Sequence, residues 1–121
     1  MVAKILIIAE DEAVRDSLCA LLQSFSYDVA PFASGEEFFG RMSIGGDCLL
    51  VDQSMPGMCG LDVLEHLYAT DDPIPAVLMS GHCNFSIALR AECLGVNVLP
   101  KPVPEEMLLM CIERVCKPRA V

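Results

Sequence analysis

A chain of 121 residues is the size of one domain and is long enough to bury a substantial core. Hydrophobic residues make up 54% of the chain and charged residues 21%, which excludes a disordered protein. The net charge of −9 argues against direct nucleic-acid binding, since phosphate recognition needs a basic surface.

The cysteines and the N-terminal run indicate where the protein resides. Seven cysteines, an odd number with no Cys-x-x-Cys pair, favour reduced thiols in an intracellular setting. Cys59 and Cys83 fall in predicted loops and are the candidates for reactive thiols. The first apolar run is too short for a membrane span or a signal peptide, and Lys4 interrupts it. We therefore expect a soluble, cytoplasmic protein with no membrane contact.

Apolar runs and helical patterns alternate regularly along the chain. In chain order we expect a strand over 4–9, a helix over 12–25, a strand over 27–32, a helix that begins near Ser34, a strand that ends at Asp52, a helix over 61–68, a strand over 76–80, a helix over 84–93, a strand over 96–99 and a helix that begins at Pro104. Five strands alternating with five helices predict a parallel sheet covered on both faces. Right-handed crossovers restrict this α/β chain to a doubly wound sheet.

Local signals refine several of these boundaries. Ser34, followed three residues later by Glu37, matches a capping box at a helix start. Gly95 is placed to end the helix over 84–93. Pro104 is expected as the first helical residue, and Gly57 as a turn residue with positive φ.

Polar side chains stand at four predicted strand ends. Glu10 and Asp11 follow the first strand, Asp52 ends the third, Ser80 ends the fourth and Lys101 follows the fifth. In a doubly wound sheet these ends lie near one another, where ligands bind. Two carboxylates about 4 Å apart repel by roughly 4 kcal/mol at an effective dielectric near 20, so the cluster either takes up protons or binds a cation. With oxygen ligands alone, Mg²⁺ (or Mn²⁺) is the expected occupant.

Lys101 and Ser80 extend this edge toward phosphoryl chemistry. Lys101 supplies a positive charge and Ser80 a hydroxyl donor, so an anion held between them and a metal ion would lie close to Asp52. This combination predicts in-line phosphoryl transfer to Asp52, with the metal ion and Lys101 neutralising the phosphoryl oxygens.

Four motifs together resemble one protein family over essentially the whole chain. They are Ile8-Ala9-Glu10-Asp11-Glu12, Leu50-Val51-Asp52-Gln53-Ser54-Met55-Pro56-Gly57-Met58-Cys59-Gly60, Met79-Ser80-Gly81-His82 and Lys101-Pro102. In this order they resemble the receiver domain of response regulators, in the CheY-like superfamily, and most of all receivers of the FixJ type. Receivers of that type usually precede a DNA-binding helix-turn-helix domain.

The resemblance implies a fold and a domain layout. The fold is a flavodoxin-like (βα)₅ three-layer sandwich with strand order 2-1-3-4-5. Residues 1–117 would form the receiver, and 118–121 the start of a linker to an output domain. A sensor histidine kinase would be the partner that phosphorylates the domain.

The resemblance also assigns a metal site. Asp11 and Asp52 would ligate Mg²⁺ directly, the Ser54 backbone carbonyl would be a third ligand, and Glu10 would act nearby or through water.

The phosphoryl group is assigned its own set of residues. Asp52 would be the phosphoacceptor, Lys101 would pair with the phosphoryl oxygens, and Ser80 would move in to hydrogen-bond them. The Lys101–Pro102 peptide bond is expected to be cis, since X-Pro is the linkage in which cis is accessible. His82 is either an exposed loop residue or, with Ser54, a flank of the water that hydrolyses the acyl phosphate. His66 is interpreted as a helix-surface histidine.

Two residues depart from the family pattern. The first acid is Glu10 where an aspartate is usual, and its extra methylene changes its reach toward a metal ion. Val98 stands three residues before Lys101, where the family commonly carries Phe or Tyr. That aromatic normally swings inward as the serine or threonine moves, whereas valine has little conformational range. We expect phosphorylation to survive and its readout to be altered.

We therefore expect the domain to act as a signalling switch and not as a turnover enzyme. Phosphorylation would bias a two-state equilibrium expressed on the face of the fourth helix, fifth strand and fifth helix. That face would mediate homodimerisation or contact with a fused DNA-binding output domain, and so regulate transcription.

Other classes of protein fit less of the sequence. A degenerate receiver that binds partners irrespective of phosphorylation is the alternative that Val98 and Glu10 keep open. A phosphatase with an aspartyl nucleophile would need a second acid where Ser54 stands. A flavin site would need Ser, Thr or Gly donors in the loop after the first strand, and that loop is acidic.

Overall fold

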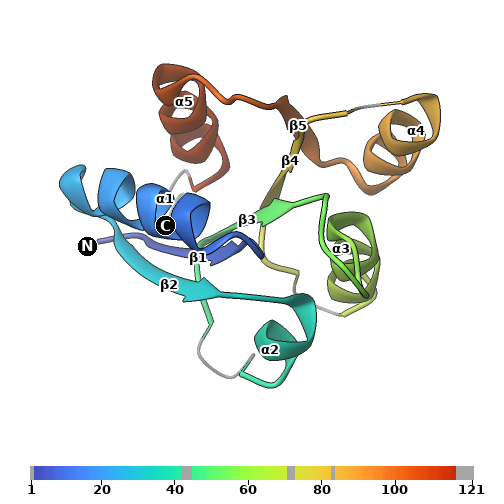
Figure 1. Cartoon of the computed structure of the whole chain (residues 1–121), viewed down its shortest axis with the longest axis horizontal. Coiled ribbons are helices and arrows are strands. Elements are labelled where there is room, and N and C mark those ends of the chain that lie inside the picture. The colour runs from blue at the N-terminus through green and yellow to red at the C-terminus, as the bar shows by residue number, and fades with distance from the viewer. Residues whose placement is uncertain (1, 42–44, 71–72, 83, 117–121) are drawn as a thin grey trace, which may run out of the picture.

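The strands of the protein form a single parallel sheet (Figure 1). The structure is a computed structural model that describes residues 2–41, 45–70, 73–82 and 84–116. Its strands are β1 (Lys4–Ile8), β2 (Asp28–Phe32), β3 (Cys48–Asp52), β4 (Ala76–Ser80) and β5 (Asn97–Pro100). Its helices are α1 (Glu12–Ser24), α2 (Gly35–Phe39), α3 (Gly60–Tyr68), α4 (Phe85–Leu94) and α5 (Glu105–Val115). The strand order β2-β1-β3-β4-β5 confirms the predicted topology.

Helices cover both faces of the sheet, which makes three layers (Figure 1). On one face, strand residues such as Leu6 and Val51 pack with residues of α2, α3 and α4. On the other face, alternate strand residues such as Ile7 and Leu50 pack with residues of α1 and α5. Because side chains alternate across a strand, burial on both faces requires the continuous apolar runs seen in the sequence.

The predicted boundary signals occur where expected, with one exception. Ser34 Oγ accepts a hydrogen bond from the Glu37 amide at 3.0 Å and caps α2. Gly95 and Gly57 have φ values of 72° and 75°, in the left-handed region. The prediction for Pro104 was wrong by one residue, because its ψ of 138° is extended and it therefore precedes the helix as the N-cap of α5.

Two predictions concern residues outside the described chain, and a third concerns a helix boundary. Cys83 and the linker over 118–121 lie outside the described residues. Cys59, predicted in a loop, is the N-cap of α3. In the described part of the chain, no helix is long and apolar enough to cross a membrane.

Candidate functional site

Asp52 is a buried carboxylate at the carboxyl edge of the sheet. It is the last residue of β3 and is 5% exposed. Its Oδ1 lies 2.7 Å from Lys101 Nζ and also accepts a hydrogen bond from the Ser54 amide at 3.1 Å. A buried carboxylate needs a counter-charge and hydrogen bonds to offset its lost hydration. Lys101 and the Ser54 amide supply them to Asp52.

Lys101 is held in place by the neighbouring strand end. Its backbone N–H donates to the Ser80 carbonyl at 2.9 Å, just beyond the last β4–β5 pair. A Cβ atom on Gly81 would lie 3.7 Å from the Lys101 side chain, so the lysine stem runs close to this glycine. The Lys101–Pro102 peptide bond is cis. These contacts place the ammonium group beside the end of β3.

Ser80 ends β4 and directs its hydroxyl into its own loop. The residue is 3% exposed. Its Oγ donates to the His82 carbonyl at 3.1 Å and accepts from the His82 amide at 3.3 Å. The hydroxyl is therefore engaged with backbone, whereas the His82 residue is exposed.

The loop after β1 presents the predicted acidic residues. Glu10 and Asp11 are both exposed, and Asp11 is the N-cap of α1. Asp11 Oδ1 accepts hydrogen bonds from the amides of Ala13 and Val14 at 2.9 and 3.2 Å. A carboxylate in this position satisfies helix amides and complements the helix dipole.

Arg15 holds the same loop and was not singled out from the sequence. Its guanidinium group donates to the carbonyls of Ala9 at 2.8 Å and Glu10 at 3.2 Å. These bonds fix the backbone directly before Asp11. The only sequence signal was a basic residue one helical turn after the acidic run.

The predicted metal site would bind its cation through oxygen atoms. The carboxylates of Asp11 and Asp52 and the main-chain carbonyl of Ser54 are hard ligands, which Mg²⁺ and Mn²⁺ prefer. Across 2–41, 45–70, 73–82 and 84–116, no three His, Cys, Asp or Glu side chains converge as a metal centre. By its chemistry, this donor set fits a cation that keeps several of its own waters, as Mg²⁺ usually does.

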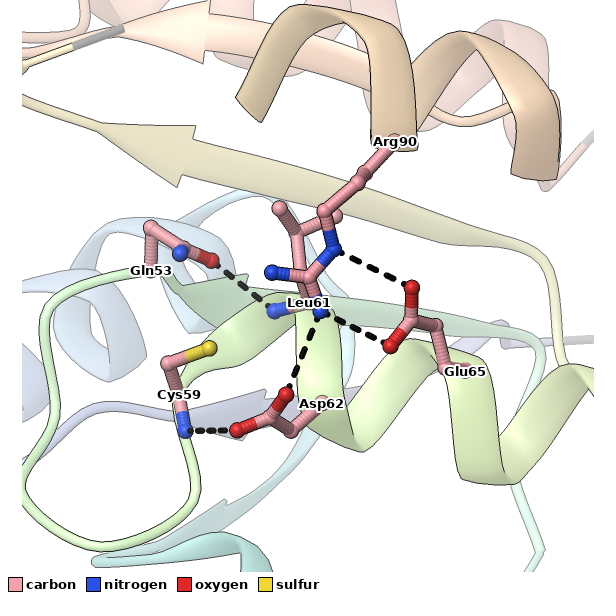
Figure 2. Close-up of polar contacts among 6 residues, drawn as sticks. All are labelled: Gln53, Cys59, Leu61, Asp62, Glu65 and Arg90. Carbon is pink, nitrogen blue, oxygen red and sulfur yellow. Dashed lines mark hydrogen bonds and ion pairs between the residues drawn. The ribbon is translucent and has the colours of Figure 1, made fainter. Parts of the chain in front are cut away.

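Gln53 is a second residue that the sequence did not reveal as part of the site. Its main-chain N–H donates to the Met79 carbonyl at 2.8 Å, and its main-chain carbonyl accepts from the Gly60 N–H at 3.2 Å. Its side-chain Oε1 accepts from the Leu61 amide at 2.8 Å (Figure 2). Gln53 therefore joins the end of β3 to the start of α3.

Val98 occupies the β5 position where the family commonly carries an aromatic residue. It is half-buried and packs against the apolar cluster under α2, α3 and α4. Its register partner is Leu78 of β4. The side chain therefore serves as core filling in this conformation.

Fold and site together define a class of protein. A doubly wound sheet of order 2-1-3-4-5 that ends in a buried aspartate paired with a lysine is the architecture of a CheY-like domain. The family model of the response regulator receiver domain matches residues 5–113. The chain belongs to the response regulator receiver family.

Two relatives in sequence are bacterial regulators. The chain is 34% identical over 111 residues to the transcriptional regulatory protein FixJ of Bradyrhizobium diazoefficiens, covering 90% of this chain and 54% of FixJ. It is 35% identical over 117 residues to the response regulator protein TmoT of Ectopseudomonas mendocina, covering 93% of this chain and 52% of TmoT. The chain therefore spans about half the length of these relatives.

Solved structures show the same fold. The response regulator StyR aligns with a TM-score of 0.86 at 33% identity, over 94% of this chain and 59% of StyR. A receiver domain protein from Methanospirillum hungatei aligns with a TM-score of 0.89 at 23% identity, over 96% of this chain and 94% of that chain. The predicted receiver resemblance and flavodoxin-like fold are confirmed.

Proposed function

We propose that this chain is the phosphoacceptor receiver of a two-component response regulator and that Asp52 accepts the phosphoryl group. The carrying observation is the Asp52 carboxylate, buried at the end of β3 and 2.7 Å from the Lys101 ammonium. Burial keeps water from the carboxylate, and the ammonium group lies where negative charge would increase on phosphorylation.

The residues suggest a division of labour for the transfer. An Asp52 carboxylate oxygen attacks the phosphorus of a kinase phosphohistidine, a P–O bond forms, the P–N bond breaks, and the imidazole leaves and takes up a proton. Lys101 neutralises phosphoryl oxygens. Ser80 releases its loop contacts with His82 and hydrogen-bonds the new phosphoryl group. Ser54 and His82 would flank the water that later hydrolyses the acyl phosphate.

Asp11, Asp52 and the Ser54 carbonyl would hold Mg²⁺ or Mn²⁺, with Glu10 nearby or through a water molecule. When bound, the cation would neutralise charge on the phosphoryl oxygens. Asp11 can bind through the part of its carboxylate that does not cap α1, and Arg15 keeps the backbone before it fixed.

The relatives support a proposal for the wider role. We propose that residues 1–117 form the receiver and that 118–121 begin a linker to a DNA-binding output domain, because FixJ and TmoT are about twice as long as the match. The partners would be a sensor histidine kinase in the cytoplasm and a second copy or the output domain, docking on the α4–β5–α5 face. The domain would then act as a switch for transcription instead of a turnover enzyme.

A degenerate receiver is the second candidate function. Val98 in place of an aromatic favours it, and so does the self-contained hydrogen bonding of Ser80. Such a domain would bind its partner in the same way with or without phosphorylation.

Intact mass measurement after incubation with a small acyl phosphate and Mg²⁺ tests the proposal. We expect one phosphoryl adduct on the wild type, none on Asp52→Ala, and loss of the adduct when Mg²⁺ is chelated. An adduct of equal yield on Asp52→Ala, or no adduct on the folded wild type, would overturn the proposal. Arg41→Met, a change away from the site, serves as the control and should be phosphorylated like the wild type.

A further inference from the structure

The start of α3 is pressed onto the backbone of the phosphoacceptor strand. Gln53 binds this helix start through its main-chain carbonyl to Gly60 and through its side chain to Leu61. A Cβ atom on Gly60 would lie 2.7 Å from the Asp52 carbonyl oxygen and 3.0 Å from the Gln53 Cα. No side chain fits in this contact, so the backbone at Asp52 and the start of α3 lie in direct contact.

The first turn of α3 is joined to α4 by an arginine. Asp62 Oδ2 accepts from the Cys59 amide at 3.3 Å, while its Oδ1 lies 3.2 Å from the Arg90 guanidinium (Figure 2). One turn further, Glu65 receives two hydrogen bonds from Arg90, at 2.7 and 3.1 Å. The two-point contact fixes the direction of the guanidinium plane, which a single contact would leave free.

The apolar contact of α4 with the core is narrow, with Ile87 and Leu94 only partly buried against it. Among its described residues only Ala91 is fully buried, and Phe85 and Leu89 are 82% and 48% exposed. A helix with so little buried area depends more than its neighbours on polar contacts for its orientation. In the described chain, Arg90 makes ion pairs with two residues of α3.

We propose that Gln53 and Arg90 are positioning residues that couple the state of Asp52 to the orientation of α4 through the start of α3. This inference rests on the proposed phosphoacceptor role of Asp52. It supplies a route to the α4–β5–α5 face that does not need an aromatic side chain at Val98. A change at the end of β3 moves the Gly60–Leu61 backbone, the movement shifts Asp62 and Glu65, and Arg90 carries it to α4.

Hydrogen exchange of the α4 amides, with and without a small acyl phosphate and Mg²⁺, tests this coupling. We expect phosphorylation to change α4 exchange in the wild type and to leave it unchanged in Arg90→Met, which still takes up the phosphoryl group. In the unphosphorylated Arg90→Met protein, α4 should exchange about two- to fivefold faster, the size expected for an exposed ion pair. An α4 response in Arg90→Met equal to that of the wild type would overturn the proposal.

Conservative variants separate coupling from simple loss of structure. Arg90→Lys keeps the charge and loses the two-point contact, so it should respond like Arg90→Met. Gln53→Met removes the acceptor for the Leu61 amide and should also uncouple α4, whereas Gln53→Glu retains an acceptor and should restore the response. Arg41→Met, on the loop after α2, is the matched control and should respond like the wild type.

A second arm needs no phosphoryl group. Asp52→Asn removes the charge at the site, and its effect on the NMR chemical shifts of the α4 amides is compared in wild-type and Arg90→Met backgrounds. We expect α4 shifts to change only when Arg90 is present. No change in either background would overturn the coupling. If the wild-type protein forms no phosphoryl adduct, but Asp52→Asn still changes the α4 shifts only when Arg90 is present, the coupling is supported. Only the phosphoacceptor role is then overturned.

Discussion

The Lys101 ammonium lies 2.7 Å from Oδ1 of Asp52, and the two side chains differ in exposure, 31% for the lysine and 7% for the aspartate. The carboxylate is almost completely shielded from solvent, while the lysine side chain is still partly exposed. The two partners therefore differ in the cost of their removal. Removing the lysine leaves a buried carboxyl group without a partner, whereas removing the aspartate leaves a lysine that water can solvate.

The first prediction follows from this asymmetry. Lys101→Met should lower the free energy of unfolding by about 1–3 kcal/mol, because the buried Asp52 carboxyl group loses its partner. Adding Asp52→Asn should recover most of that loss. Urea denaturation of the two single variants and the double variant measures the difference, and additive losses would contradict it.

The rate of phosphorylation should be affected by the loss of Lys101 separately from the stability of the fold. Without the Lys101 charge, the rate of adduct formation at Asp52 should fall by about 100-fold or more, since a charged group beside the reacting oxygens is lost. Time courses of intact mass with a small acyl phosphate give this rate. A rate within threefold or so of the wild type would show that Lys101 serves stability alone.

Gly60 gives a steric prediction. Gly60→Ala places a methyl group 2.6 Å from Leu78 Cδ1 and 2.7 Å from the Asp52 carbonyl oxygen, and this backbone cannot move away easily. We expect a loss of about 1–3 kcal/mol in the free energy of unfolding. Gly81→Ala is the control, because its new methyl group would meet Lys101 at an ordinary 3.7 Å. Equal stability of the two variants in urea would contradict the prediction.

The contact between α3 and α4 should weaken in acid. The Cys59 contacts and Arg90 hold the pKa of Asp62 below its ordinary value of 3.8, and Arg90 holds the pKa of Glu65 below 4.5. A depressed folded-state pKa stabilises the protein above the ordinary value, and that contribution disappears as the pH falls through the folded value. Both carboxylates are partly exposed, so the effect should be only a few tenths of a kcal/mol or so.

This acid effect can be assigned to Arg90 by comparison. The difference in unfolding free energy between the wild type and Arg90→Met should be greatest near neutral pH and should vanish below the depressed pKa values. Thermal or urea denaturation across the acidic range measures it. A difference that grows as the pH falls would have the wrong sign.

Cys116 should be more reactive than the buried thiols of Cys48 and Cys111. A hydrogen bond from the Cys48 thiol lowers the pKa of Cys116, and the same bond together with burial raises the pKa of Cys48. Burial also raises the pKa of Cys111. Since the thiolate is the nucleophile, iodoacetamide should label Cys116 before Cys48 and Cys111 near neutral pH.

The same hydrogen bond supplies the control. Cys48→Ala removes the donor, so the pKa of Cys116 should rise and its labelling should slow, whereas Cys111→Ala should leave the rate as it was. Peptide mass spectrometry after timed labelling reads each cysteine separately. Faster labelling of Cys116 in Cys48→Ala would contradict the assignment.

The sequence predicts features that depend on short-range patterns. The alternation of strands and helices predicted a parallel sheet covered on both faces, and every residue of β3 is buried. Gly95 ends α4 in the left-handed conformation because a residue without Cβ adopts it freely. Asp52 and Lys101 were expected at one edge because parallel strands end together, and the structure pairs them.

Contacts across long sequence separations were not predictable in the same way. Arg90 meets Glu65, 25 residues earlier, and no local pattern marks two exposed charged residues on different helices as partners. Gln53 binds Leu61 because the intervening loop returns to the strand end. In the sequence alone, Gln53 is indistinguishable from an ordinary polar residue. The direction of the Ser80 hydroxyl depends on a rotamer that the backbone of the next two residues selects.

The two hydrogen bonds of Ser80 with His82 set an energetic threshold within the chain. Both partners are main-chain atoms, so replacing the side chain at His82 leaves them in place. A phosphoryl group on Asp52 would have to offer Ser80 more than this pair of bonds before the hydroxyl turned. If Asp52 is the phosphoacceptor, as we propose, the cost of turning Ser80 is set by main-chain atoms, and a substitution at position 82 would leave that cost unchanged.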